Sequence, residues 1–418
     1  MSRWSRFVTA FALAGIGLTL LPPRCGGAAQ APPAATAAAP AGDEIAQLKR
    51  ELEALRQEYG SRMAAIESRI TALEGAEAAA PQPAAEPAPP PATAPSSAAK
   101  FFNPDMAAIG NFVGVAGPSP GSGEPSLSLQ ESEFSFQAVV DPYARADFYL
   151  TFGPEEVGVE EGYITFPTLP GGFLAKVGKM REAFGRVNTE HPHTLPFADL
   201  PLISRNLLGG EALSDSGISA ARLVPIPWFF LEATGQVYRG ESDLFEAPTR
   251  GDLQYVGRLR AYRDLTESTN LDAGGSIAYG NNGTTADSTT RLLGVDATLR
   301  WKPLRRSIYR HFLARGEFVW SRTGAEAGSF ESVGGYGYLE YQFARRFTAG
   351  LRYDNSERAQ APGPRDEGGS FILTFKPSEW SLVRAQYRRT SFAGEDSAAN
   401  ELLFQFLFSI GAHGAHPF

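Results

Sequence analysis

Cysteine is nearly absent from this chain. Cys25 is the only one among 418 residues, so no disulfide can form within the chain. Beyond the N-terminal segment, no apolar run approaches the roughly 20 residues that a membrane-spanning helix needs. The net charge is −8, which disfavours a nucleic-acid partner. Neither an H-E-x-x-H motif nor a P-loop occurs, and we expect no enzymatic activity.

The N-terminal segment has the pattern of a secretory signal. Two arginines precede an apolar stretch over residues 7–21, and Ala28 and Ala29 offer a cleavage site, so we predict a signal peptide over residues 1–29. A lipoprotein signal has small residues just before its cysteine, whereas Cys25 follows two prolines and an arginine. A lipid anchor is therefore the weaker alternative.

A short helical pattern follows an Ala/Pro-rich segment at residues 30–42. Within residues 43–75, apolar side chains recur every three or four positions, at Ile45, Leu48, Leu52, Leu55, Tyr59, Met63, Ile66, Ile70 and Leu73. This spacing indicates an α-helical coiled coil. A lone helix of this length is marginal in water, so we expect partner helices, most simply in a trimer. Packing on the rim of the chain's own barrel is the alternative. A semi-rigid Pro/Ala linker fills residues 76–102.

Residues 103–418 alternate apolar and polar side chains in segments of about ten residues, separated alternately by short turns and longer polar loops. Phe312, Phe318 and Trp320 share one face of such a segment, for example, while Arg315 and Glu317 share the other. A soluble β-sandwich also alternates. Alternating loop lengths, however, are typical of outer-membrane barrels, in which closure satisfies every backbone hydrogen bond in lipid.

The pattern predicts an all-β transmembrane barrel of about 16 antiparallel strands around an aqueous lumen, with fourteen or eighteen strands as the alternatives. The expected strands begin near Ala108, Leu127, Ala144, Val157, Gly172, Asp215, Trp228, Asp252, Thr269, Thr290, Phe312, Ser332, Arg346, Glu367, Ser381 and Asn400. The longer loops are expected at 185–213, 240–251, 280–289, 322–331 and 355–368. Phe418 resembles the terminal aromatic that the outer-membrane assembly machinery reads. We expect the barrel in the bacterial outer membrane, with the coiled coil in the periplasm.

One stretch is similar to a known family. Residues 173–186 contain Gly178, Lys179, Phe184 and Gly185 in a run that resembles the V-G-(K/R)-(F/M)-x-x-x-F-G strand of phosphate-selective-porin-like (O/P-like) outer-membrane proteins. Residues 195–201 and 215–218 also resemble that family. The resemblance implies a sixteen-stranded, often trimeric porin that passes small solutes by diffusion, with its third external loop folded into the lumen. A plain surface loop at 185–213 is the alternative.

Charged side chains on the expected lumen face and in the 185–213 loop are candidates for lining the pore or its constriction. They are Lys176, Lys179, Arg181, Arg186, Glu190, Asp199, Arg205, Arg258, Arg260, Arg300, Arg315, Glu317, Arg352 and Arg384. Rings of charge set ion preference in pores. A lumen with both signs produces a transverse field, with at most a weak preference for anions.

Two histidine pairs suggest a minor metal hypothesis. His191 and His193 lie in the longest loop, and His413 and His416 lie near the C-terminus. Imidazole suits zinc or copper, but three or four convergent ligands are needed, and the two pairs are expected at opposite ends of the barrel. No other cofactor is expected. The rival to a channel is a structural barrel whose coiled coil tethers the outer membrane to periplasmic or cell-wall partners.

Overall fold

The computed structural model describes residues 104–119, 125–153, 157–210, 213–242, 244–285, 288–326, 328–359 and 361–411, and the single residues 57 and 68. The expected signal peptide, linker, Phe418, His413 and His416 lie outside the described residues, as does the coiled coil apart from those two positions. The chain divides into two units, Met1–Ala92 and Thr93–Phe418. The second unit holds the barrel.

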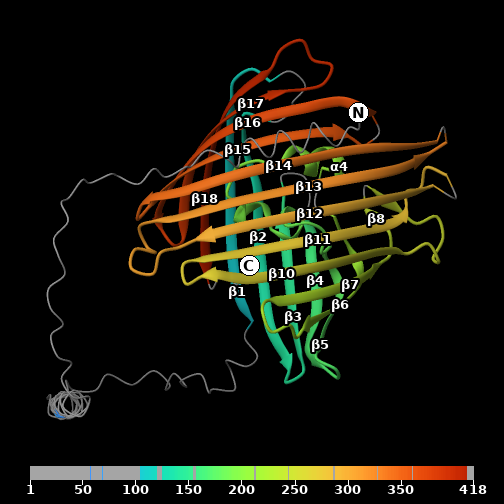
Figure 1. Ribbon diagram of the computed structural model, residues 1–418, viewed down its shortest axis with the longest axis horizontal. Helices are drawn as coiled ribbons and strands as arrows, with labels where there is room; N and C mark the ends of the chain where they lie inside the picture. The colour runs from blue at the N-terminus through green and yellow to red at the C-terminus, as the bar shows by residue number, and fades with distance from the viewer. Residues whose placement is uncertain are drawn as a thin grey trace, which may run out of the picture. The chain divides into compact units, whose positions relative to one another are not determined.

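Sixteen strands form a closed antiparallel barrel, which confirms the predicted all-β barrel of about 16 strands (Figure 1). They are β1 (Asp105–Ala116), β2 (Leu127–Asp141), β3 (Ala144–Phe152), β4 (Val157–Leu169), β5 (Phe173–Arg181), β6 (Ser214–Val224), β7 (Phe230–Tyr238), β10 (Gln254–Thr266), β11 (Thr269–Asn281), β12 (Thr289–Trp301), β13 (His311–Ala325), β14 (Gly328–Ala344), β15 (Phe347–Arg358), β16 (Ala361–Ser378), β17 (Ser381–Ser391) and β18 (Ala399–Gly411). A small separate hairpin, β8 (Glu241–Ser242) with β9 (Phe245–Glu246), lies between β7 and β10 in the chain.

The first and last strands close the sheet. β1 pairs with β18 from Ala107 opposite Gly411 to Ala116 opposite Leu402, and every other strand pairs with its neighbours in the barrel. The start of β1 and the end of β18 therefore lie at the same rim as the short turn between β2 and β3. Closure leaves no unpaired sheet edge, so the wall satisfies its own backbone hydrogen bonds.

The wall is inverted relative to a soluble protein. In β12, Leu293 and Val295 are exposed on the outside, whereas Asp296 and Thr298 are buried inside. The same inversion holds in β13, where Arg315 and Glu317 are the buried residues. An apolar exterior around a polar interior suits contact with acyl chains. The barrel's outer surface is thus built for lipid.

Two of the expected long loops are wrong. The region 322–331 is strand up to Ala325 and again from Gly328, and the region 355–368 is strand up to Arg358 and again from Ala361. Charged cross-strand partners hold the second hairpin together: Arg358 pairs with Asp366 across the two strands. A polar composition was read as loop, but opposite charges facing each other on paired strands stabilise the ladder instead.

The barrel's core lies inside it and includes one long insertion. Residues 182–213, between β5 and β6, carry η1 (Val187–Thr189), η2 (Pro192–Thr194) and the six-residue helix α4 (Leu202–Leu207). Buried side chains of this loop, such as Phe184, Phe197 and Ile203, form one apolar cluster with inward-facing wall residues such as Tyr336. Within the described residues, no helix combines the length and the apolar character needed to cross a membrane.

We predict that Val295→Arg lowers the free energy of unfolding by about 2–4 kcal/mol, because the mid-strand side chain of Val295 faces lipid. Leu304→Arg is the matched control, since Leu304 is at least as exposed but lies in the turn between β12 and β13, and we expect it to change stability by less than about 0.5 kcal/mol. Denaturant unfolding in lipid vesicles measures both. Equal, small effects would show that the outer face meets water.

Candidate functional site: the loop inside the barrel

The loop 182–213 folds into the barrel, where side chains from several parts of the wall hold it. Helix α4 packs against β13, β14, β15 and β16, as its position in Figure 1 also indicates. The rest of the loop contacts inward-facing residues of β2, β4, β11 and β17. The lumen position that the family resemblance implies for this loop is the one observed. Its anchors define the candidate functional site.

A glycine and a buried carboxylate form the first anchor. Gly185 has a left-handed φ of 61°, and a β-carbon there would collide with the Glu317 carboxylate. That carboxylate accepts the backbone N–H groups of Arg186 (3.3 Å) and Val187 (3.1 Å). Beside it, the fully buried ring of Phe184 packs over Gly294 of β12. The two motif residues Phe184 and Gly185 therefore fit the start of the loop to the wall.

The second anchor is a chain of buried ion pairs. Arg315 of β13 donates to both carboxylate oxygens of Glu190, at 2.7 and 3.1 Å. Arg186 also donates to Glu190 (2.7 Å), and its guanidinium lies 3.7 Å from Asp272 of β11. A bidentate arginine–carboxylate pair sets orientation as well as distance. The loop backbone is thereby held in register with β11 and β13.

Asp199 makes the third anchor on the far side of the loop. It forms ion pairs with Arg352 of β15 (2.8 Å) and Arg388 of β17 (2.7 Å), and it accepts a hydrogen bond from Gln386. Burial alone would raise the pKa of Asp199, but the two guanidinium groups hold it well below its usual range. Arg352 also lies over the ring of Phe197, 4.5 Å from its centroid. Asp199 stays charged and paired at any pH near neutrality.

The opposite wall is acidic. The loop residue His191 lies within 3.4 Å of Glu133 of β2 and of Glu160 and Glu161 of β4. The next histidine, His193, lies within 3.6 Å of Glu131 and Glu133 of β2. Burial would lower the pKa of the His191 imidazole, yet the carboxylates of Glu133, Glu160 and Glu161 raise it well above the ordinary value. This wall therefore favours positive charge on the loop.

The remaining predicted lumen residues are placed as follows. Arg258 contacts Ser276 and Asp296, and Arg260 and Arg300 both face Asp272. Arg384 donates hydrogen bonds to Thr374 and Gln405. Lys176 lies over the ring of Tyr163, and Arg181 forms an ion pair with Glu160. Arg205 is exposed on α4. Most of these charges are thus engaged with partners inside the barrel.

Lys179 was predicted to line the lumen, but its side chain lies on the outer side of β5. It shares its side of β5 with the exposed Val177, and its ammonium donates to the backbone carbonyl of Val159 (2.7 Å). Gly178, between them, lies so close to the backbone of Gly162 that a β-carbon there would collide with it. The family motif at this point serves strand packing rather than the pore.

Sequence reasoning did not find the neutral residues that receive the loop. Gln386 of β17 donates to Asp199 and accepts the backbone N–H of Ala198 (2.9 Å). Gln236 of β7 accepts the N–H of Ala183 (2.7 Å). Strand alternation places both glutamines inside, but the path of the loop across the lumen is not periodic and left no signal.

No protein-family model matches this chain. A protein of Aquifex aeolicus (strain VF5), described as an uncharacterized protein, is 32% identical over 339 residues, which cover 70% of this chain and 70% of that protein.

Solved outer-membrane proteins share the fold at low sequence identity. The anion-selective porin from Comamonas acidovorans aligns with 74% of this chain and 99% of its own, with a TM-score of 0.53 and 9% identity. The loop L8 deletion mutant of OmpT, an outer membrane protein of Vibrio cholerae, covers 74% and 99% with a TM-score of 0.52 and 12% identity. The outer membrane channel DcaP of Acinetobacter baumannii covers 74% and 96% with a TM-score of 0.50 and 12% identity. These likenesses concern the fold alone.

We predict that Gly185→Ala loosens the loop from β13. The substitution combines the cost of a left-handed alanine, about 1–2 kcal/mol, with displacement of the Glu317 carboxylate from its two backbone donors. Gly172→Ala is the matched control, because Gly172 also has a left-handed φ, of 75°, but its β-carbon would meet nothing within 4 Å. Thermal unfolding in detergent compares the two. Indistinguishable melting temperatures would argue against the Glu317 anchor.

A pH dependence follows from Glu182, the first residue of the loop. Its side chain is fully buried and accepts one hydrogen bond, from Gln254 (2.7 Å), and burial raises its pKa to about 8. The folded chain therefore holds this proton more tightly than the unfolded chain, whose glutamate pKa is 4.5. The stabilisation is complete below that value and is lost as pH rises to about 8.

The test replaces the titrating group with its neutral analogue. Glu182→Gln should remove this contribution. The melting temperature of the variant relative to the wild type should therefore rise steadily between about pH 5 and pH 8 and then stay level, and measurements about 1 pH unit apart resolve this trend. Melting curves in detergent at matched ionic strength measure the difference. A constant difference over this range contradicts a protonated Glu182.

Proposed function

We propose that this chain, which belongs to the same family as the Aquifex aeolicus protein, is an outer-membrane channel of the porin type that passes small hydrophilic solutes by diffusion. One observation carries the proposal: a closed sixteen-stranded barrel has an apolar outer surface and a charged interior, with the loop 182–213 anchored across that interior. Barrels of this circumference enclose an aqueous lumen rather than filling it with wall side chains alone. The loop is then the constriction.

The distribution of charge supports a transverse field at this constriction. The wall β2–β4 carries Glu131, Glu133, Asp147, Glu160 and Glu161 on its inner side. The wall β10–β13 carries Arg258, Arg260, Arg300 and Arg315, which outnumber its carboxylates Asp272, Asp296 and Glu317. These two groups of strands lie on opposite sides of the barrel's strand order. A solute that passes the loop therefore moves between a negative wall and a wall with a slight excess of positive charge.

We further propose a weak preference for anions. Arg260 and Arg300 have side chains that are 29% and 30% exposed, whereas Asp272, the carboxylate between them, is only 5% exposed. The acidic wall is covered by the loop residues His191 and His193, which are both buried. The charges that remain accessible to a passing ion on the basic wall are thus cationic.

The finer assignments are also proposals. The match around Gly178, Lys179, Phe184 and Gly185 supports membership of the phosphate-selective-porin-like (O/P-like) family. The seam at residues 43–75 supports a homotrimer formed through a periplasmic coiled coil together with the barrel. The apolar exterior supports outer-membrane lipid as the surrounding medium, and Phe418 supports delivery by the outer-membrane assembly machinery.

We predict that the purified protein conducts ions in planar bilayers, with conductance steps in threes if it is trimeric. Under a salt gradient the reversal potential should indicate slight anion preference, and Arg260→Glu combined with Arg300→Glu should shift it toward cations, because both side chains face the lumen. Arg291→Glu on β12 is the matched control, since Arg291 lies on the outer face of the strand that carries Arg300. It should leave the reversal potential unchanged.

Two results would reject the proposal. Electrical silence of well-folded protein would favour the structural tether, and a reversal potential that the double variant does not move would remove Arg260 and Arg300 from the ion path.

A further inference from the structure

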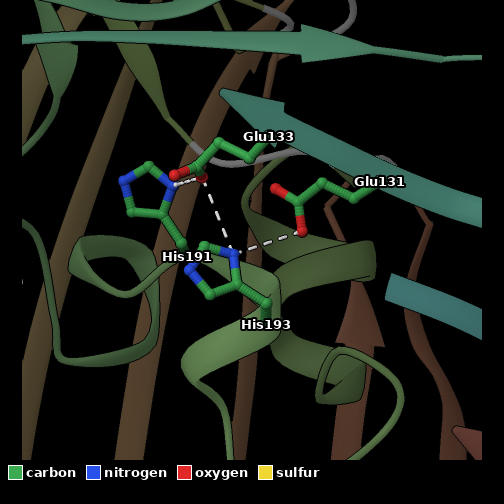
Figure 2. A group of neighbouring side chains, drawn as sticks. All are labelled: Glu131, Glu133, His191 and His193. Atoms are coloured by element: carbon green, nitrogen blue, oxygen red, sulfur yellow. Dashed lines mark ion pairs between the residues drawn. The ribbon is translucent and has the colours of Figure 1, made fainter. Parts of the chain in front are cut away.

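Two short sequence repeats of opposite chemistry meet inside the barrel. Glu131 and Glu133, two residues apart on β2, share its inner face because strand side chains alternate. His191 and His193 flank the first residue of η2 in the loop. Figure 2 shows the two carboxylates pointing from the strand toward the two imidazole rings. One oxygen or nitrogen of each residue lies within 4.8 Å of those of the other three.

The distances within this group match the edges of a metal coordination polyhedron. The Glu133 oxygen Oε2 lies 2.9 Å from His191 Nδ1 and 3.6 Å from His193 Nδ1. The Glu131 oxygen Oε2 lies 3.5 Å from His193 Nδ1. Zinc binds histidine nitrogen and carboxylate oxygen at about 2.0–2.2 Å in a tetrahedron, whose edges are then about 3.3–3.6 Å long. Two of the three distances lie at this edge length, the third is shorter, and all four atoms lie within 4.8 Å of one another, so small rotations of the side chains would place them around one ion.

Burial and charge also call for a cation at this point. Glu133 is 0% exposed, and apart from its ion contacts with the two histidines neither of its carboxylate oxygens accepts a well-oriented hydrogen bond. The same is true of Oε2 of Glu131. Four carboxylates gather here, those of β2 together with Glu160 and Glu161, but Arg181 is the one arginine that the described contacts bring to them. The four carboxylates outnumber the two groups of opposite charge that contact them, Arg181 and His191, and buried charge that is only partly compensated is costly, so a divalent cation would stabilise the group.

We propose that Glu131, Glu133, His191 and His193 bind one divalent transition-metal ion, with zinc as the physiological candidate. Two imidazole and two carboxylate ligands suit Zn²⁺ and disfavour Mg²⁺ and Ca²⁺, which prefer oxygen ligands alone. The second nitrogen of His191, Nε2, lies 3.3 Å from Glu161, the carboxylate–histidine arrangement that orients a metal-binding imidazole. The site uses one of the two histidine pairs and completes it with β2, not with His413 and His416.

Its structural consequence is a metal clip between the loop and the wall. The Glu317 anchor joins the loop to β13, and the Asp199 anchor joins it to β15 and β17. Neither anchor reaches β2, which is separated from β17 by the closing strands β18 and β1. The proposed ion would fasten the loop there, and it would stabilise the folded state by mass action, because the unfolded chain does not hold the four ligands together.

The test is titration of the full, purified protein in detergent with ZnCl₂ after chelator treatment, followed by calorimetry. We expect one ion per chain, unaffected by millimolar MgCl₂, and a higher melting temperature. Glu131→Gln and His193→Gln should each weaken binding at least tenfold, since each removes one of four ligands, a loss of about 1.4 kcal/mol or more. X-ray absorption of the loaded protein should show only nitrogen and oxygen neighbours near 2.0–2.1 Å, about the range for zinc.

Matched controls separate this site from general histidine chemistry. His311→Gln removes the imidazole of another His–Glu pair, with His311 3.1 Å from Glu340, and should leave binding unchanged. Replacing His413 and His416 together with glutamine should also leave it unchanged. Circular dichroism confirms that each variant retains the barrel. Absence of saturable zinc binding to the wild type overturns the proposal, as does binding that survives both site substitutions.

Discussion

The constraint on which this structure depends is that its wall must satisfy every backbone hydrogen bond within itself. Lipid offers no donors or acceptors, so a sheet that faces acyl chains is stable only when its first and last strands pair. The pairing of β1 with β18 meets that requirement. Once the sheet is closed, alternation leaves half of the side chains facing inward, and polar residues collect there because the outside is reserved for apolar ones.

The inward-facing charges make a second level of order possible. Arg315, Glu317 and Arg352 would each be costly to bury alone, and each forms an ion pair or hydrogen bond with an atom of the loop 182–213. Wall and loop are therefore mutually dependent: the loop supplies partners to the wall, and the wall fixes the path of a segment whose described residues form one α-helix, of six residues. Such a loop follows a well-defined path inside the barrel with little regular secondary structure of its own. The acidic group on β2 and β4 extends the same principle to the two loop histidines, where we propose that a metal ion completes the compensation.

The strand pattern was predictable to a large extent because its physical cause is local. A side chain at each second position faces lipid, so apolar residues recur with period two whatever the rest of the chain does. The strand starts expected near Leu127, Val157 and Ser381 coincide with the observed ones. The hairpin of β15 and β16 was predicted too short. Its charged residues are typical of a loop, but Arg358 and Asp366 form an ion pair across the two strands and so extend the sheet. Lys179 was misplaced for a related reason, because its charge suggested water while its register put it outside.

The sequence by itself determined the closed barrel, its strand number to within about two and the identity of most inward-facing charges, because alternation and turn residues act over a few neighbouring positions. Only the tertiary structure decided which of those charges meet. Glu133 and His191 are far apart in the chain, and so are Asp199 and Arg388, yet each pair is in contact once the loop enters the lumen. No periodicity encodes that path, since it depends on many contacts between residues that are far apart in the chain.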